Sequence, residues 1–440
     1  GLRRRADLRM IERALPKAGP SGPMRAREMA WLYLPAFATA LGYGAVLPIL
    51  PRLLERLHGT GGGVDLPVHA GLLTGVYIAA FVIAAPLWGR LSDARGPRLV
   101  ILVGLGGYAA ATAWLGVVAT LGTAYLARFL AGLFAAGLVP AISALIVARC
   151  EGSLRARHLA WLNAATILGF LVGPALAGAL HDVLERSSSP FSGALHVTAI
   201  PIWTSGAIAL LAALGVAGGV RTHRASNDDP NSVTVRPPIV LPMRGILILS
   251  AYGAFGLGAF EVGLTLQSQQ AWRWSPAAVG GLFAVCSLVM LVIQIALFGR
   301  LQRWVAPAGV VITGFVAMAV GFLILATVSS YTAVMGLVAL IAVGSGILLP
   351  TLSALLAAQS GPRIGVAIGF QSAAANLGQA AGSAAAGLLF DGSPSRPFAI
   401  VAVALFVAAA LAWHVTRRPL AVASVDAEPA RPSSHRVQGD

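Results

Sequence analysis

Long runs of apolar residues, separated by short polar segments, extend along almost the whole chain. A helix that crosses the hydrocarbon core of a membrane needs about 20 such residues in succession. The pattern predicts helices of this kind at residues 30–50, 69–88, 98–120, 122–148, 158–181, 196–218, 245–268, 276–298, 306–327, 331–358, 364–390 and 397–416. We therefore expect an all-α polytopic membrane protein with twelve transmembrane helices.

The composition supports this prediction and excludes several classes of protein. Hydrophobic residues make up 57% of the 440 residues and charged residues only 11%, against about 25% charged in an ordinary soluble domain. A soluble chain of this length has too little interior to bury so much apolar surface. The composition excludes disorder and a collagen-like fold, and it argues against a soluble enzyme.

The net charge of +15 would suggest a nucleic-acid partner in a soluble protein. In a membrane protein, basic residues gather on the cytoplasmic side. If the N-terminus is cytoplasmic, 25 of the 31 basic residues lie in or beside cytoplasmic segments, five lie outside and Arg128 lies within a helix. The distribution predicts that both termini are cytoplasmic, and we expect no nucleic-acid partner.

Few residues could support cofactor or metal chemistry. Lys17 is the only lysine, so no P-loop lysine is present. Cys150 and Cys286 are too few for a disulfide framework or a zinc site. The first 29 residues are basic and lack an apolar core, so we expect no cleavable signal peptide there. We expect no cofactor and no metal.

The chain divides into two related parts around its longest polar interior segment. We expect a basic tail at 1–28, a six-helix half at 29–218, a cytoplasmic linker at 219–244, a second six-helix half at 245–417 and a tail at 418–440. LGFLVGPALAGALHD at 168–182 recurs as LGQAAGSAAAGLLFD at 377–391, and Gly89-Arg-Leu recurs as Gly299-Arg-Leu. Parallel repeats of this kind are typical of transporters with a substrate site near the membrane midplane.

Three motifs in the first half carry a family resemblance. The loop after the second predicted helix contains Gly89, Asp93, Arg95, Gly96 and Arg98, and it resembles the G-x-x-x-D-R-x-G-R-R loop of the major facilitator superfamily. Ala94 and Pro97 replace two of the usual basic residues. The fourth helix contains Arg128 and Gly132, similar to the R-x-x-x-G motif of that family.

The fifth helix carries the third motif, Gly169, Gly173, Pro174 and Gly178. It is similar to the G-x-x-x-G-P-x-x-G signature of proton-driven exporters, although its last glycine comes one residue late. Small residues at this spacing let helix backbones approach closely. We expect a close contact with the opposite half at the outer side, with packing alone as the alternative. The resemblance, which covers about residues 30–417, points to the tetracycline and multidrug efflux branch.

The resemblance also implies roles for the charged motif residues. Gly89 and Gly96 fit a tight cytoplasmic turn. Asp93 would approach the N-terminus of helix eleven, where the helix dipole favours an anion, and lock the cytoplasmic side. The alternative is that Asp93, Arg95 and Arg98 are solvated loop charges that only set topology. Arg128 would face the central cavity near an acid, or else pair with carbonyl groups or extend to the outer surface.

Glu261 is the candidate proton-coupling residue, because among the sixteen acidic residues only Glu261 lies deep within a predicted helix. Its neighbours at three-, four- and seven-residue steps include the small and polar residues Ala254, Gly258, Thr265 and Ser268, so it should point into the bundle. A buried carboxyl group could be protonated in one state and ionised in another. The efflux branch commonly has an acid in the first helix, and none lies there. We expect Thr39, Tyr43, Thr265 and Gln294 to line the same cavity; a hydrogen-bonded glutamate that serves packing alone is the alternative.

These observations predict a secondary transporter that exports small amphiphilic molecules in exchange for protons. Its expected partners are the lipid bilayer, protons and a small-molecule substrate, and we expect a monomer in the inner membrane of a bacterium. A facilitator-fold importer or uniporter of a metabolite is the main alternative. A membrane enzyme or sensor has weaker support, since the chain has no H-E-x-x-H motif and nucleophiles such as Ser143 lie in apolar surroundings without a nearby histidine.

Overall fold

The computed structural model describes residues 26–58, 65–150, 152–186, 194–220, 241–297, 305–360, 364–390 and 393–417. Every regular element within these ranges is helical, so the predicted all-α fold is confirmed. The elements are α2 (Ala26–His58), α3 (Leu66–Arg95), α4 (Pro97–Val117), α5 (Leu121–Ala135), α6 (Leu138–Arg149), α7 (Gly152–Arg186), α8 (Ala194–Gly219), α9 (Leu241–Leu266), η1 (Gln267–Ala271), α10 (Pro276–Val292), η2 (Ile293–Leu297), α12 (Pro307–Leu325), α13 (Tyr331–Ser360), α14 (Ile364–Phe390) and α15 (Arg396–Arg417).

The helices account for all twelve predicted segments. The segment at 122–148 is two helices, α5 and α6, which meet just before Pro140; proline has no backbone N–H to continue a helix. The π-helical turns η1 and η2 extend α9 and α10. In the part of the chain that the structure describes, eleven helices are long and apolar enough to cross a membrane. The remaining predicted segment is α14, which carries Gln371, Asn376 and Gln379.

Several helices are longer than their apolar segments, because a helical backbone can continue beyond the membrane core. This corrects the interpretation of Gly89. The helix α3 continues to Arg95, so Gly89 lies inside it and not in a turn, and nothing lies near enough to require a glycine there. The turn between α3 and α4 is made at Gly96 alone, whose φ of 86° suits a residue without a side chain.

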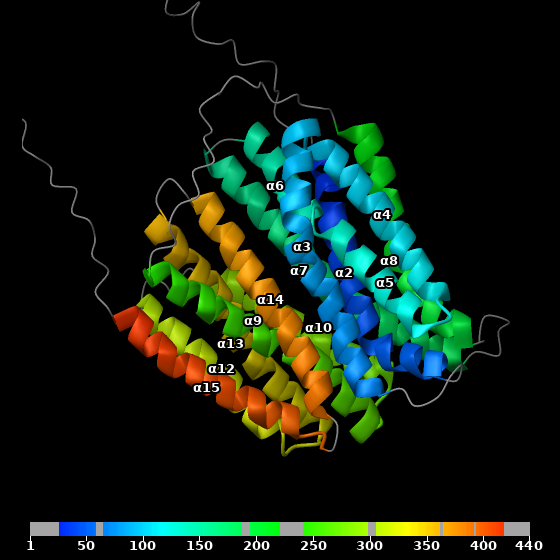
Figure 1. Cartoon of the computed structure of the whole chain (residues 1–440), viewed down its shortest axis with the longest axis vertical. Coiled ribbons are helices and arrows are strands. Elements are labelled where there is room, and N and C mark those ends of the chain that lie inside the picture. The colour runs from blue at the N-terminus through cyan, green and yellow to red at the C-terminus, as the bar shows by residue number, and fades with distance from the viewer. Residues whose placement is uncertain are drawn as a thin grey trace, which may run out of the picture.

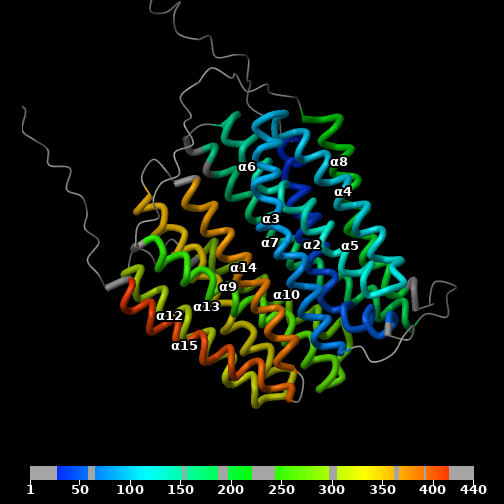
Figure 2. Tube along the Cα trace, viewed as in Figure 1, coloured from blue at the N-terminus to red at the C-terminus, as the bar shows by residue number. Residues whose placement is uncertain are grey.

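The helices form two groups, which we call the N-terminal bundle (α2–α8) and the C-terminal bundle (α9–α15). Figure 1 shows the first group in blue to green and the second in green to red, with α10 and α14 at the border. The tube in Figure 2 shows the same arrangement. The contacts that join the bundles are made mainly by α14 with α3 and by α10 with α7. The predicted tails and most of the predicted linker lie outside the described residues.

The bundles meet closely at one end of the molecule. We call it the far end, where α2 finishes at His58, and we call the other end, where α2 begins at Ala26, the terminal end. At the far end, Gly71 and Gly75 of α3 lie against the backbone of α14 between Ala380 and Gly387. Gly178 of α7 lies against the backbone of Pro276 in α10. These contacts leave no space for a side chain between the backbones.

Candidate functional site

The candidate site is centred on Glu261, which lies five residues before the end of α9 and is only 2% exposed. Tyr43 of α2 donates its hydroxyl hydrogen to Oε2 of Glu261. Gln379 of α14 donates from Nε2 to both carboxylate oxygens, at 3.1 Å each. Because Tyr43 belongs to the N-terminal bundle and the other two residues to the C-terminal bundle, this cluster links the two bundles in the protein interior.

Glycines bring α9 and α14 together at this point. Gly258 lies one turn before Glu261, and a Cβ atom on it would overlap the carbonyl oxygen of Gln379. Gly378 and Gly382 of α14 are in similarly close contact with the backbone of α9. Direct backbone contact between the helices places the Gln379 amide opposite the carboxylate. The small residues near Glu261 in the sequence of α9 therefore form the surface on which α14 packs.

Arg128 reaches the same cluster through aromatic rings. Its guanidinium carbon lies 4.5 Å from the ring centre of Tyr77 and 6.0 Å from that of Tyr43, and the two rings stack with centres 5.1 Å apart. The guanidinium Nε donates to the carbonyl of Leu73 at 3.4 Å. Arg128 is 2% exposed, and its Nη2 has no hydrogen-bond partner among the described residues. Cation–π contacts of this kind stabilise a buried guanidinium.

The R-x-x-x-G spacing explains this position of Arg128. Gly132 follows Arg128 by one helical turn, so both residues face the same way. A Cβ atom at Gly132 would overlap the carbonyl oxygen of Tyr77, which shows that α5 and α3 are in direct contact there. The glycine thus brings Arg128 against the Tyr77 ring. Arg128 forms no ion pair with Glu261, and Tyr43 lies between them.

The other predicted cavity residues are divided between this cluster and other places. Thr265 donates to the backbone carbonyl of Glu261 at 2.7 Å. Thr39 instead donates to the carbonyl of Pro35 in its own helix at 3.0 Å, as helical threonines often do. Gln294 lies in η2 near the terminal end and accepts a hydrogen bond from Asn163 of α7 at 3.1 Å. Among the described residues, no hydrogen bond joins Thr39 or Gln294 to Glu261.

Comparison with known proteins identifies the family of this helical arrangement. The family model of the Major Facilitator Superfamily matches residues 32–308 and residues 246–436. The chain belongs to the Major Facilitator Superfamily. It is 26% identical over 386 residues to multidrug resistance protein 1 of Bacillus subtilis, which covers 86% of this chain and 94% of that protein. It is 25% identical over 373 residues to the quinolone resistance protein NorA of Staphylococcus aureus, covering 83% and 90%.

A solved superfamily structure has the same fold. It is a bacterial homologue of the human lysosomal transporter Spinster in an inward-facing, occupied conformation. The structures agree with a TM-score of 0.70 at 16% identity, over 90% of this chain and 97% of the other. The family and its transporter relatives identify the chain as a multi-pass membrane transporter.

The exporter-like motif of this superfamily member serves two different contacts. Gly169 and Gly173 lie against the carbonyl groups of Phe37 and Leu41 in α2, within the N-terminal bundle, and not against the opposite half as expected for the whole motif. Gly178 makes the contact with the opposite bundle at the far end. Pro174 joins the two contacts, because Gly44 of α2 packs on its ring and Gly280 of α10 packs on its carbonyl group.

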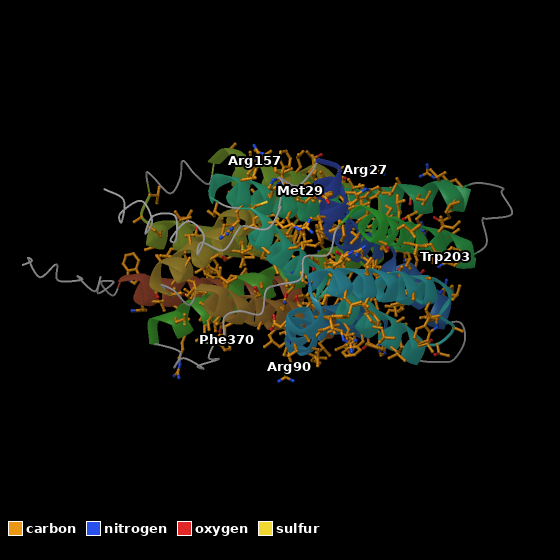
Figure 3. The ribbon with its side chains drawn as sticks, turned by 90° about the horizontal axis from the view of Figure 1, so that it is seen from above. Arg27, Met29, Arg90, Arg157, Trp203 and Phe370 are labelled. Atoms are coloured by element: carbon orange, nitrogen blue, oxygen red, sulfur yellow. The ribbon has the colours of Figure 1, made fainter. Side chains whose placement is uncertain are left out.

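The charged loop motif lies at the terminal end, away from α14. Asp93 and Arg95 are exposed, and Asp93 forms no hydrogen bond or ion pair with the residues that the structure describes. Arg90 projects away from the helices (Figure 3). The expected contact of Asp93 with the start of α14 is absent here, because α3 meets α14 about 27 Å further along its axis, around Gly75.

Arg98 differs from the other charges of this motif. Its Nη2 donates to the carbonyl of Ala217 at 2.6 Å, in the last turn of α8. A cation at the C-terminal end of a helix is stabilised by the free carbonyl groups there. The interpretation of Arg98 as a solvated loop charge is therefore wrong, because this arginine ties α4 to α8 within the N-terminal bundle.

Sequence reasoning missed Tyr77 and Gln379. Tyr77 is one aromatic residue among many in apolar segments, and its role depends on the approach of α5 at Gly132. Gln379 had a usable signal: in the internal repeat it occupies the position that Phe170 holds in the first half. A polar residue replacing an aromatic one within an otherwise apolar block indicates a polar partner nearby, and that partner is Glu261.

Proposed function

We propose that the chain is a proton-coupled exporter of small amphiphilic compounds that works by alternating access in the inner membrane of a bacterium. Two bacterial relatives are named for drug resistance, which supports export of such compounds. The observation that carries proton coupling is the buried carboxyl group of Glu261, held between the two bundles. Intramembrane acids usually serve function, because burying one is costly.

The hydrogen bonds around Glu261 suit an ionised carboxylate. Tyr43 and Gln379 both donate to it, and an ionised carboxylate only accepts hydrogen bonds. Hydrogen bonds to a charged acceptor are roughly twice as strong as those between neutral groups. When a proton binds Glu261, one oxygen becomes a donor and the charge disappears. The bond from Tyr43, which crosses between the bundles, is then weakened, and the bundles are freer to move apart.

Arg128 supports the ionised state of this cluster. A buried carboxylate without a nearby cation is strongly destabilising. Arg128 supplies a positive charge that is separated from Glu261 only by the Tyr43 side chain. We propose that Arg128 fixes the Tyr43 ring and offsets the charge of the carboxylate while Glu261 has no proton.

The conformation fits one stage of the exchange. The bundles are in backbone contact at the far end, around Gly71 and Gly178. A cavity beside Thr265 and Thr74, toward that end, measures only about 10 Å³, room for about one water molecule. We propose that this stage follows proton release toward the terminal side. In the opposite stage the far end opens, Glu261 takes up a proton and substrate leaves.

The charged loop after α3 has its proposed role in the opposite stage, in which the far end is open. We propose that both termini are cytoplasmic, as the distribution of arginines indicates. When the far end opens, the terminal end must close, and Asp93 can then reach the N-terminus of α14. The partial positive charge of that helix terminus favours a carboxylate. In this proposal Asp93 is a lock of the other conformation, which explains why it is exposed in this one.

Dye efflux measured in inverted membrane vesicles tests the proposal. Wild-type vesicles should take up a fluorescent amphiphilic dye when energised and lose this uptake with a protonophore. Glu261→Gln should insert normally and lose the protonophore-sensitive uptake. Glu55→Gln is the matched control, because Glu55 is half-exposed and forms an ion pair with Arg52 at 3.1 Å, outside the Glu261 cluster. Full protonophore-sensitive uptake by Glu261→Gln would refute the proposed role of Glu261.

A further inference from the structure

A second cluster of ionisable residues lies at the far end of α7, separate from the Glu261 cluster. The Nδ1 atom of His181 lies 3.7 Å from Oδ1 of Asp182 and 3.9 Å from Oε2 of Glu185. One ligand-capable atom from each of the three residues lies within 4.8 Å of both of the others. The three side chains therefore converge on one point, although they come from a single turn of helix.

Two of these atoms are buried without a hydrogen-bond partner. His181 is 2% exposed and Asp182 is 9% exposed. Among the described residues, neither Nδ1 of His181 nor Oδ1 of Asp182 has a hydrogen-bond partner. Burying such atoms without a hydrogen bond is unfavourable, and a cation placed between them would satisfy both.

The spacing of the three atoms fits a metal ion better than a hydrogen bond. Hydrogen bonds between nitrogen and oxygen are about 2.7–3.2 Å long, shorter than both distances at His181. Two ligands of a tetrahedral zinc ion, each at about 2.1 Å from the metal, lie roughly 3.4 Å apart. The observed 3.7 Å and 3.9 Å are close to this value. The Asp182 and Glu185 oxygens lie within 4.8 Å of each other, so side-chain rotations that bring them closer would complete the coordination of one ion.

We propose that His181, Asp182 and Glu185 form a site for a divalent transition-metal ion of the zinc type. Zinc accepts imidazole nitrogen and carboxylate oxygen as ligands, and three protein ligands leave the fourth tetrahedral position open to water. The carboxylates bring two negative charges to the site. Arg186 lies 3.9 Å from Oδ2 of Asp182, which leaves Oδ1 free for the metal.

The position of the site follows from the packing of α7. Gly178, about one turn earlier, holds α7 against Pro276 of the C-terminal bundle. Packing of this part of the helix buries His181, whereas the Glu185 side chain remains 55% exposed at the rim. A metal can therefore enter from the surface. The site does not depend on proton coupling, and it would remain if Glu261 had no role in transport.

Calorimetric titration of the purified, tag-free full chain in detergent with Zn²⁺ tests this site. We expect one equivalent of Zn²⁺ to bind to the wild type and this binding to be lost in His181→Ala. Glu185→Gln, at the exposed rim, should fold normally and bind at least about 10-fold more weakly. His69→Ala is the matched control, because His69 also lies near the far end but its Nδ1 is 2.8 Å from the Tyr125 hydroxyl.

Two results would overturn the proposal. One is a wild-type protein that binds no single equivalent of Zn²⁺. The other is a set of variants, Glu185→Gln and His181→Ala, that bind Zn²⁺ as tightly as the wild type. Because Glu185→Gln changes a half-exposed side chain, the test remains decisive even if His181→Ala does not fold. A Zn²⁺-dependent rise in melting temperature that is present in His69→Ala and absent in Glu185→Gln would support the site independently.

Discussion

The helix pair α2–α7 in the N-terminal bundle and the pair α9–α14 in the C-terminal bundle are built on the same packing. In each pair, two glycines one turn apart on the second helix lie against two carbonyl groups of the first. The contacts are Gly169 with Phe37, Gly173 with Leu41, Gly378 with Ala251, and Gly382 with Phe255. The correspondence extends to Gly44 and Gly258, which lie near the carbonyl groups of Phe170 and Gln379.

The two pairs differ in chemistry where they agree in packing. One turn beyond Gly44 the chain has Leu47, and one turn beyond Gly258 it has Glu261. Likewise, Phe170 in the first pair corresponds to Gln379 in the second. The packing is therefore duplicated and the polar cluster is not. Backbone contacts at glycines constrain only the glycine positions, so the intervening positions were free to become apolar in one bundle and ionisable in the other.

The largest expected effect is the loss of folding when a glycine of the shared packing is replaced, and this loss should be equal in both helix pairs. Gly173→Val and Gly382→Val each place a branched side chain on a backbone carbonyl that cannot move aside. We expect both variants to lose the monodisperse peak in size-exclusion chromatography. Gly369→Val, in α14 at a position with nothing nearby, should behave as the wild type. Normal folding of either valine variant would show that the two helix pairs do not both require the glycine–carbonyl contacts.

The difference in chemistry predicts that the acid cannot simply be moved. The double variant Leu47→Glu, Glu261→Leu transfers the carboxyl group to the corresponding position of the N-terminal pair. There it lacks the counterparts of its two donors, because Phe170 corresponds to Gln379 and Leu257 corresponds to Tyr43. We expect no protonophore-sensitive dye uptake, measured on protein that remains monodisperse. Restored uptake would show that a carboxyl group in either bundle is sufficient for coupling.

This comparison also shows how much the sequence could predict. The length of the apolar segments and the internal repeat were sufficient to predict the helices and the family, because a membrane restricts a chain to few architectures. Glu261 could be found because a single deep acid is conspicuous. Tyr43 could be predicted to line the same cavity, because Tyr43 and Thr39 form a polar stripe on one face of an otherwise apolar helix.

The remainder depended on packing between helices distant in sequence. Thr39 and Gln294 are polar and lie in apolar segments, yet one bonds to its own backbone and the other to Asn163. Asp93 is exposed in this conformation, and the contact with α14 that we propose for it belongs to another one. Gln379 becomes part of the site only because Gly258 lets α14 approach α9. Polarity alone could not distinguish these cases, since each requires a contact partner to be known.

A smaller effect on efflux is expected when Gln379 of the α9–α14 pair is replaced by phenylalanine, the residue found at the corresponding position 170 of the α2–α7 pair. Gln379→Phe removes the donor that serves both oxygens of Glu261. A hydrogen bond to a charged group contributes about 1.5–3 kcal/mol, so we expect efflux to fall by about 10-fold or more in the vesicle assay. The mirror variant Phe170→Gln alters aromatic contacts with Tyr43 and Phe283 but removes no hydrogen bond to Glu261, and it should retain protonophore-sensitive uptake. Equal losses in both variants would contradict the assignment of Gln379 to the carboxylate.

The smallest effect concerns Tyr43, the residue through which the N-terminal bundle hydrogen-bonds to Glu261. Tyr43→Phe keeps the ring that stacks on Tyr77 and faces Arg128. It removes the hydroxyl group that donates to Glu261 and accepts from Gln379 at 3.4 Å. Gln379 still donates to both oxygens, so a net loss of about 1 kcal/mol and an efflux rate lower by about fivefold are expected. Tyr43→Leu, which also removes the ring beside Arg128, should lose much more. If Tyr43→Phe transports at the wild-type rate, the bond between the bundles does not contribute to coupling, and the asymmetry resides in α9 and α14 alone. If Tyr43→Phe is as inactive as Glu261→Gln, the hydroxyl group itself takes part in proton transfer. Both bundles then contribute a residue to the proton-transfer step.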